Sequence, residues 1–600
     1  MIFLAISWLL ILSVLTGLGI GAFSLFTRAL GDKYGTTADI FQFAWLGYAS
    51  LIAIFQIYSL FLPIDQYAVL VLIVVSLLGY FFNISLIRKL IQTSAKACGN
   101  YGYLLVIGVL IITAVQARNA FFMPIHYDTE LYNLNAVKWI NNFPAVPGIV
   151  HLHARLALNS SFHLFAAATN IWLGADRAIH IANGFLLLLL SCQFFFHITC
   201  LMNRKGSLQS YFAILTFPLL AALSYGGTIP SLSTDLPYVI LSLATIMMLL
   251  STGQQSSDLA TWRTSLNSHN LLTWLMTAAL ATAAFSTKLA AAPLLAIILF
   301  TSLYLAIQYY SGGKDGRLSF TILCAMYILP FLIIAGLIIR YVILSGWLVY
   351  PFPIGNLHLE WSSAPEQVVN MLNWTLSWAR MPGIRPEEVL GNGMSYWLIP
   401  WLVRFSHNYL ALLLLFFGCG TIIYAVLCNK LKQYSFPFAL AITISVTEML
   451  FWFVSAPDYR FVEVFFWVFA AAATAPFLMG INHKNRFVLI IVLISLTSAT
   501  LWLKNIQQEI RTPNPFTDTP HLFTAPRPAF PRIMLTRVLV NNGQTPPLVV
   551  YKPVNTDMCG NSPLPCSPYV DENSTIVYRV PGDLTKGFKA SGPNPPDMHR

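Results

Sequence analysis

The sequence predicts an all-α integral membrane protein of about 14 transmembrane helices, followed by a small β-containing domain at the carboxyl end. Of its 600 residues, 57% are hydrophobic and only 10% are charged, whereas soluble domains usually carry about 25% charged residues. Apolar runs long enough to cross a bilayer recur along residues 1–504, and residues 505–600 lack them. Lipid is therefore expected to surround most of the chain.

The apolar runs give the expected spans. Each is near or above the roughly 18 residues that a bilayer requires. A long run from Asn270 to Tyr310 is divided at Lys288, because a lysine at the bilayer midplane would cost several kcal/mol. The first run has no charge before Arg28 and is expected to be a retained span rather than a cleaved signal. The expected spans begin near Ile2, Ile40, Tyr67, Tyr103, Ile179, Tyr211, Leu236, Leu271, Leu289, Leu318, Tyr409, Phe436, Phe461 and Phe487.

The distribution of basic residues predicts the orientation. The net charge is +11, but the lysines and arginines lie in alternate short loops and do not gather on one face, which argues against a nucleic-acid partner. The positive-inside rule makes those loops cytoplasmic. Both termini and the long loops near residues 118–178 and 345–405 are then external. The basic loop residues are Arg28, Lys33, Arg88, Lys89, Lys96, Arg204, Lys205, Lys314, Arg317, Lys430, Lys432, Lys484 and Arg486.

Residues 505–600 are expected to form the external, periplasmic domain. A proline-rich linker around Arg511 and Pro526–Pro531 leads to strand-like runs at Leu548–Tyr551 and Thr575–Tyr578. Cys559 and Cys566 lie close together there, and a disulfide suits an oxidising compartment. A zinc-binding pair is the alternative, although no second ligand pair follows at a standard spacing.

The first long loop carries the most suggestive polar residues. Asp128 and Glu130 are expected at the start of a short helix whose apolar face is formed by Leu131, Leu134, Val137 and Trp139. Simple capping by Asp128 is the alternative interpretation. The residues that follow supply the base, cation and amide groups that a sugar-phosphate site uses. They are His151, His153, Arg155, Asn159 and His163. A metal site that combines His151 and His153 with Asp128 or Glu130 also stays open.

Four further charged residues fall at predicted external helix ends: Asp235, Lys288, Asp458 and Arg460. Each has an ordinary explanation, since Asp235 could cap a helix, Lys288 could extend toward water and Asp458 could pair with Arg460. Their shared membrane face favours a binding site, because a lipid-linked phosphate is a natural ligand for Lys288 and Arg460. The tryptophans of the second long loop fit an interfacial belt better than sugar stacking.

This order of parts resembles the GT-C class of membrane glycosyltransferases, which use polyprenyl-phosphate-linked sugars on the external face. In that class an acidic residue lies in an early external loop beside an interfacial helix, as Asp128 and Glu130 do. Later helix ends bind the donor phosphate, and Lys288 and the Ala456–Arg460 stretch are similar to these. The chain departs from the class in placing about three further spans before the Asp128 loop.

The chain resembles still more closely an uncharacterised family of bacterial membrane proteins with the same layout, from the first span to the tail. The shared motifs are Tyr127–Tyr132, Pro147–Gly148 with Asn159–Ser161, Thr287–Leu289, Tyr350–Pro353 and Pro563–Cys566. This resemblance implies a protein of the bacterial inner membrane, with a role in the cell envelope.

These observations together favour a glycosyltransferase. Asp128 is expected to act as general base on an acceptor hydroxyl, while Lys288 and Arg460 neutralise the departing polyprenyl phosphate. Glu130 would orient Asp128 or help to hold Mg²⁺ or Mn²⁺. The acceptor, a glycan, a lipid or a protein, is left open by the sequence. The alternatives are a polysaccharide polymerase or ligase, and a flippase or transporter of lipid-linked saccharides.

Overall fold

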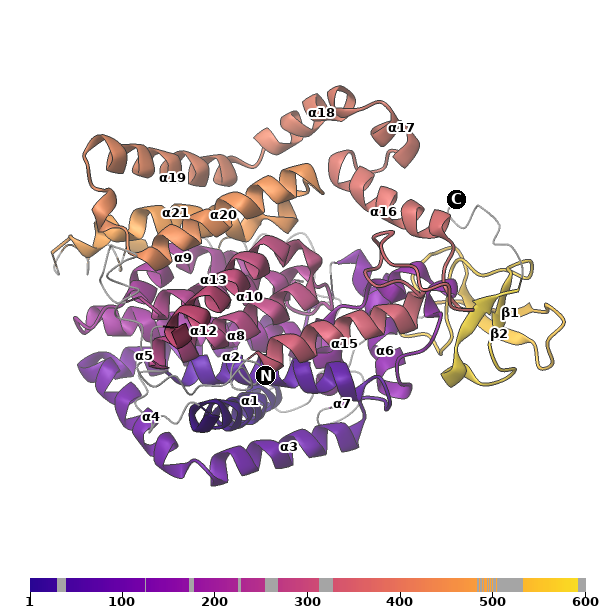
Figure 1. Ribbon diagram of the computed structural model, residues 1–600, viewed down its shortest axis with the longest axis horizontal. Helices are drawn as coiled ribbons and strands as arrows, with labels where there is room; N and C mark the ends of the chain where they lie inside the picture. Colours follow the sequence, from indigo (N-terminus) through magenta and orange to yellow (C-terminus); the bar gives the residue numbers. More distant parts are fainter. Residues whose placement is uncertain are drawn as a thin grey trace.

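The computed structural model shows a body of packed helices with a small β-structured cap at one end (Figure 1). It describes residues 1–29, 39–122, 124, 126–171, 177–224, 228–253, 268–311, 327–482 and 533–591, together with isolated residues between 485 and 503. The longer helices of the first half are α1 (Ile2–Ala29), α2 (Ile40–Tyr58), α3 (Gln66–Phe81), α4 (Ile84–Cys98), α5 (Gly102–Asn119), α6 (Leu134–Asn142), α7 (Ser161–Ile171), α8 (Ala178–Met202), α9 (Leu208–Leu223), α10 (Asp235–Ser251) and α12 (Ser268–Thr287). The second half adds α13 (Ala292–Ser311), α15 (Ile328–Ser345), α16 (Pro365–Arg380), α17 (Pro386–Gly391), α18 (Met394–Ser406), α19 (Tyr409–Leu427), α20 (Phe436–Val454) and α21 (Glu463–Met479).

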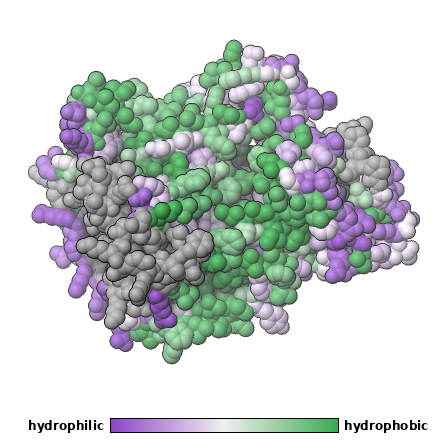
Figure 2. All heavy atoms as spheres, in the orientation of Figure 1, coloured by the Kyte–Doolittle hydropathy of each residue, from purple (hydrophilic) through white to green (hydrophobic). Residues whose placement is uncertain are grey.

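The helical body has the properties of a membrane protein. Within the described residues, eight helices are long and apolar enough to cross a bilayer, and four shorter apolar helices accompany them. Hydrophobic side chains cover much of the visible face of the body, while hydrophilic side chains gather over the cap and along the opposite edge (Figure 2). The larger number of about 14 spans is not confirmed. The expected span starts at Leu318 and Phe487 lie outside the described residues.

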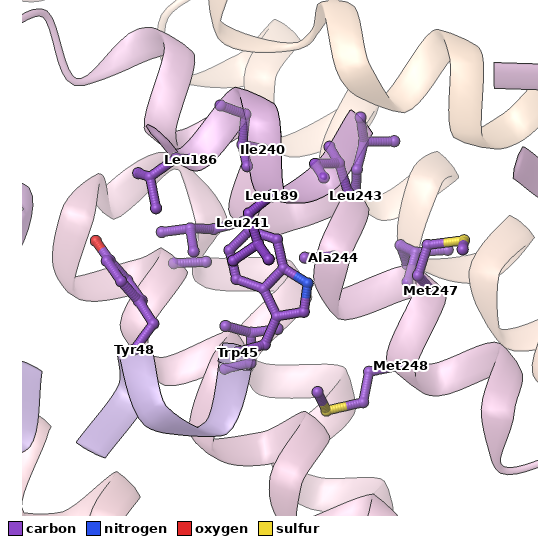
Figure 3. Close-up of a cluster of buried hydrophobic side chains, with 14 of the residues drawn as sticks. Trp45, Tyr48, Leu186, Leu189, Ile240, Leu241, Leu243, Ala244, Met247 and Met248 are labelled. Carbon is purple, nitrogen blue, oxygen red and sulfur yellow. The ribbon is translucent and has the colours of Figure 1, made fainter. Parts of the chain in front are cut away.

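The interior of the body is built where α2, α8 and α10 meet. Trp45 and Tyr48 of α2 lie among Leu186 of α8 and Ile240 and Met247 of α10, and all five are fully buried (Figure 3). Lipid is as apolar as these side chains, so close packing rather than expulsion from water holds such helices together. The large aromatic rings fill the space between three helix backbones.

Two glycines let α1 and α2 approach closely. A methyl group on Gly19 would lie 1.8 Å from the Phe43 carbonyl oxygen, and one on Gly47 would lie 1.8 Å from the Leu15 carbonyl oxygen. Small residues at such crossings allow backbone-to-backbone contact inside membranes. The pair fixes the first two helices against each other.

The predicted division at Lys288 is confirmed, because α12 ends at Thr287 and α13 begins at Ala292. Between them, Lys288 is extended and a short 3₁₀ turn, η5 (Leu289–Ala291), follows. Because of this break, Lys288 lies outside both helices, as expected if a charge at the bilayer centre is costly.

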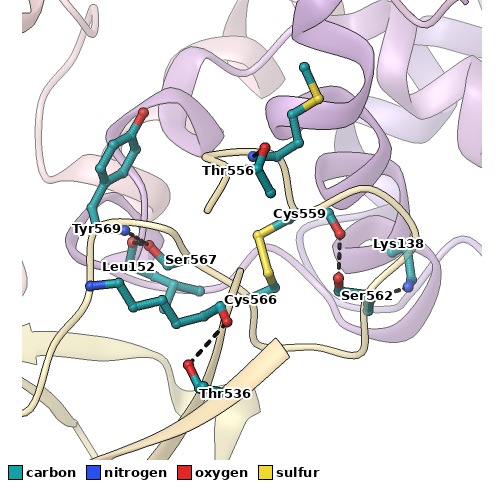
Figure 4. Close-up of a disulfide and its surroundings, with 11 residues drawn as sticks. Lys138, Leu152, Thr536, Thr556, Cys559, Ser562, Cys566, Ser567 and Tyr569 are labelled. Carbon is teal, nitrogen blue, oxygen red and sulfur yellow. Dashed lines mark hydrogen bonds between the residues drawn. A yellow bond between two sulfur atoms is a disulfide. The ribbon is translucent and has the colours of Figure 1, made fainter. Parts of the chain in front are cut away.

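The cap, residues 533–591, contains two small antiparallel sheets. One pairs β1 (Leu535–Val540) with β2 (Leu548–Pro553), and the other pairs β3 (Ile576–Tyr578) with β4 (Phe588–Ala590). The two predicted strand runs correspond to β2 and β3. Cys559 and Cys566 are joined by a disulfide (Figure 4). The predicted proline-rich linker around Arg511 and Pro526–Pro531 lies outside the described residues.

The cap is docked on the two long loops of the body. Phe588 N donates to the Pro147 carbonyl at 2.9 Å. Ser567 Oγ donates to the Leu152 carbonyl at 2.7 Å (Figure 4). Arg579 of the cap pairs with Glu360 of the second loop. The cap therefore covers the loop segment that carries most of the predicted site residues.

Candidate functional site

Four charged side chains from three separate segments form an ionic cluster at helix ends. Lys288 Nζ donates to Asp235 Oδ1 at the start of α10. Arg460 Nη1 lies 3.8 Å from Asp235 Oδ2, and Arg460 Nε lies 3.6 Å from Asp458 Oδ2. We call Asp235, Lys288, Asp458 and Arg460 the ionic cluster.

The turn that carries Asp458 and Arg460 is held by two indole groups. Trp452 Nε1 of α20 donates to the Asp458 carbonyl at 2.7 Å, and Trp401 Nε1 of α18 donates to the Pro457 carbonyl at 2.6 Å. Both tryptophans are buried. Trp401 therefore lies inside the protein, where its indole supports the turn of the ionic cluster.

Asp128 precedes the short π-helical turn η2 (Thr129–Asn133), which runs directly into α6. The side chain of Asp128 makes no capping hydrogen bond. Its Oδ1 lies 3.5 Å from Arg155 Nη1, and the two side chains are 36% and 38% exposed. The carboxylate is therefore available to a bound molecule, which plain capping would not predict.

The Asp128 segment and the ionic cluster lie side by side. The Thr129 hydroxyl accepts a hydrogen bond from Leu232 N at 3.3 Å and lies 3.4 Å from Ser231 Oγ, just before α10. The charge of Asp128 acts on Arg460, and the charges of both residues act on His126. Asp128, Lys288 and Arg460 thus converge on one region.

Asp128, Asp235, Lys288 and Arg460 all act electrostatically on the imidazole of His126. Burial lowers the pKa of its imidazole, with Asp235 acting in the opposite direction. A neutral imidazole is favoured, and it can either donate or accept a proton. His126 was not predicted from the sequence, although it stands two positions before Asp128.

Glu130 faces the cap rather than Asp128. The Gly560 N–H donates to the Glu130 carbonyl at 2.8 Å, and Glu130 Oε2 lies beside Gly560. Burial raises the pKa of the Glu130 carboxyl. Among the described residues, no three His, Cys, Asp or Glu side chains lie close enough to share a metal ion. Asp128 pairs with Arg155 and Glu130 lies beside Gly560, so a shared site for Mg²⁺ or Mn²⁺ stays a prediction.

The histidines of the first loop have internal partners. His151 Nε2 donates to the Trp361 carbonyl at 3.1 Å, and burial lowers its pKa to about 4. His153 Nδ1 accepts from Arg155 N at 3.1 Å, and its ring contacts that of Tyr569 in the cap. These contacts connect the first loop to the second loop and to the cap. Their predicted role in substrate binding stays a prediction.

Two buried charges were not predicted from the sequence, which shows few charges inside the expected spans. Glu448 of α20 is 2% exposed, and its Oε1 accepts from Leu294 N near the start of α13 at 2.9 Å. Arg340 of α15 is 4% exposed. Glu448 and Arg340 each interrupt an apolar run. An ionisable residue within an expected span is the sequence signal that could have identified both.

The helical body, the charged helix ends and the docked cap define a membrane protein with a polar site at the junction of body and cap. The chain belongs to the family described as a domain of unknown function, DUF8201, whose model matches residues 1–467. That range contains Asp128 and the whole ionic cluster. No curated protein and no solved structure matches the chain.

Proposed function

We propose that the protein is a membrane glycosyltransferase that moves a sugar from a polyprenyl-phosphate-linked donor to an acceptor on the external face. The observation that carries the proposal is the partly exposed carboxylate of Asp128, which makes no capping hydrogen bond and acts electrostatically on Arg460, the residue that shares Asp235 with Lys288. A single-displacement transfer needs a base on one side of the reacting carbon and cations on the other.

In the proposed reaction, Asp128 takes the proton of an acceptor hydroxyl as that oxygen bonds to the anomeric carbon of the sugar. The bond between this carbon and the phosphate oxygen breaks, and its electron pair leaves with the polyprenyl phosphate. Lys288 and Arg460 neutralise the departing phosphate. Configuration at the anomeric carbon inverts. Glu130 is not needed in this scheme, because it faces the cap.

Asp235 and Asp458 have a preparatory role in the same scheme. Without a donor, their carboxylates pair with Lys288 and Arg460 and so offset the cost of holding cations at a membrane boundary. A phosphate would compete with them for the same cations. The ion pairs then keep the cations oriented between turnovers.

The test uses purified full-length protein and a panel of short-chain polyprenyl-phosphate hexoses and pentoses. Asp128→Asn keeps the shape of the side chain but cannot accept a proton, so transfer should fall by about 10² or more. Asp65→Asn is the matched control, because Asp65 caps α3 by accepting from Tyr67 N and Ala68 N, a role that asparagine also fills. Full activity in Asp128→Asn would exclude the general base. Failure of the wild type with every donor would count against the whole proposal.

A flippase or secondary transporter of lipid-linked saccharides is the second candidate, and Glu448 is the observation that favours it. A buried carboxylate within a span is typical of proton-coupled transport. Glu448→Gln would then abolish movement of a lipid-linked sugar across vesicles. A transferase would keep sugar transfer in that variant.

A polysaccharide polymerase or ligase shares the donor, and the length of the product would separate it from a single-sugar transferase.

A further inference from the structure

A small cavity lies beside the Asp128 segment but is lined by other residues. It is enclosed by α6 and the following loop, by the segment from Arg155 to His163, and by Arg340 and Leu344 of α15. Its volume, counted as the space open to the centres of water molecules, is about 30 Å³. A sugar ring does not fit, whereas one small polar group does.

Arg340 is the unusual member of this cavity. Its Nε donates to Asn159 Oδ1 at 2.9 Å and its Nη1 donates to Ser59 Oγ at 2.7 Å. Both acceptors are neutral. Within the part of the chain that the structure describes, no carboxylate forms an ion pair with Arg340, although its side chain is buried. A buried cation without a counter-charge is costly.

The other polar groups of the lining are mostly donors. Arg155 also lines the cavity, and Trp139 Nε1 is buried with no hydrogen-bond partner among the described residues. Ser160 lines the same space. None of the fifteen residues lining the cavity is acidic. Two arginines and a buried indole N–H in a lining without acidic side chains match an anion and would repel a metal ion.

Arg155 connects the lining of this cavity to the Asp128 segment. Its side chain is 38% exposed, and its contact with Asp128 is a loose one at 3.5 Å. Arg155 therefore both lines the cavity and pairs with the proposed catalytic carboxylate. An anion held between Arg155 and Arg340 would draw Arg155 away from Asp128.

We propose that the cavity between Arg155 and Arg340 binds one small oxyanion, a phosphate or carboxylate group. This site is separate from the ionic cluster and goes beyond the proposed transfer reaction. The group could be a free anion, or the charged end of a larger molecule that reaches in from the Arg155 side. Both sources share the same chemistry and differ in what lies outside the cavity.

The experiment measures anion binding and needs no enzymatic activity. The purified full chain in detergent is titrated with inorganic phosphate at constant ionic strength, and in a second arm with dioctanoyl phosphatidic acid. Binding is followed by calorimetry and by the thermal shift. Arg155→Gln and Arg340→Gln should each weaken binding of at least one ligand roughly tenfold or more. Arg385→Gln, an exposed arginine elsewhere on the second loop, should leave it unchanged.

Lys288→Gln distinguishes anion binding in the cavity from anion binding at the ionic cluster, which the proposed function requires. Binding that survives in Lys288→Gln and is lost in Arg155→Gln supports the cavity. Loss in Lys288→Gln alone would overturn it and leave the ionic cluster as the anion site. Equal affinity in wild type and Arg155→Gln would also overturn it. Because Arg155 is partly exposed, Arg155→Gln still tests the cavity even if Arg340→Gln fails to fold. Binding of phosphatidic acid but not inorganic phosphate, with the same dependence on Arg155, would identify a lipid phosphate as the source.

Discussion

Asp235 pairs with Lys288 across 53 positions of sequence and with Arg460 from a third segment, so one carboxylate serves two cations. The side chains of Lys288 and Asp235 are only 17% and 19% exposed. At this burial, the loss of one partner leaves a charge that water screens poorly. The three segments that meet here are the start of α10, the break before α13 and the turn before α21.

The shared carboxylate predicts an asymmetry between two substitutions. Asp235→Asn removes the ion-pair partner of Lys288 and leaves Arg460 with Asp458 alone, so it should destabilise the protein by about 3 kcal/mol, near the lower end for a broken buried pair. Lys288→Met should cost less, because Arg460 still lies beside Asp235. In the double variant the cost should be smaller than the sum of the two. Unfolding of the purified protein in mixed detergent micelles measures all three, and additive costs would contradict the pairing.

The docking of the cap depends on a glycine contact. A methyl group on Gly587 would lie 1.9 Å from the Pro147 carbonyl oxygen, and the residue has a φ of +83°. Gly587→Ala should therefore loosen the cap and speed its removal by limited proteolysis. Gly543→Ala is the control, because Gly543 also has a positive φ, +74°, but open space around it. Similar proteolysis of both variants would show that backbone strain, about 1–2 kcal/mol, and not the contact, is responsible.

His151 predicts a loss of stability in acid. Its folded-state pKa of about 4 lies below the ordinary 6.5. Between these two pH values, His151 is therefore protonated in the unfolded chain and neutral in the folded chain. The stability is fully present above pH 6.5 and is lost as pH falls toward 4, by about 3 kcal/mol in total.

His151→Gln tests this prediction, because glutamine can still donate to the Trp361 carbonyl but does not titrate. The melting temperature of this variant should vary less between pH 6.5 and 4 than that of the wild type. His358→Gln removes an exposed histidine from the second loop and should keep the wild-type profile.

The disulfide predicts a more stable cap. Cys559 and Cys566 are 7 positions apart. Closing this loop lowers the conformational entropy of the unfolded chain and so stabilises the folded cap by about 2 kcal/mol. Replacing both by serine should lower the melting temperature of the cap and weaken its contacts with the first loop, whereas Cys428→Ser should not. Reaction of both thiols with a labelling reagent in the untreated protein would rule the disulfide out.

The fold follows largely from local features of the sequence. Apolar runs mark the helices, because a span must satisfy its own backbone hydrogen bonds in lipid. Lys288 marks a break because a charge is excluded from the bilayer centre. The strand runs near Leu548 and Thr575 mark a β-structured tail. Each of these signals depends on neighbouring residues alone, so the sequence carries it directly.

The tertiary structure decided which charges meet. The sequence offered Asp128, Glu130, Asp235 and Asp458 as similar carboxylates, yet Asp235 pairs with Lys288 whereas Glu130 faces the cap. Hydrophobic periodicity specifies which face of a helix is buried but not which distant helix end lies opposite. Arg340 is a second example, because the sequence shows only one arginine in an apolar run. Its hydrogen bonds to Asn159 and Ser59, which come from other segments, are visible only in the tertiary structure. Helix positions are thus encoded locally, while the charge pairs arise from the packing of segments far apart in the chain.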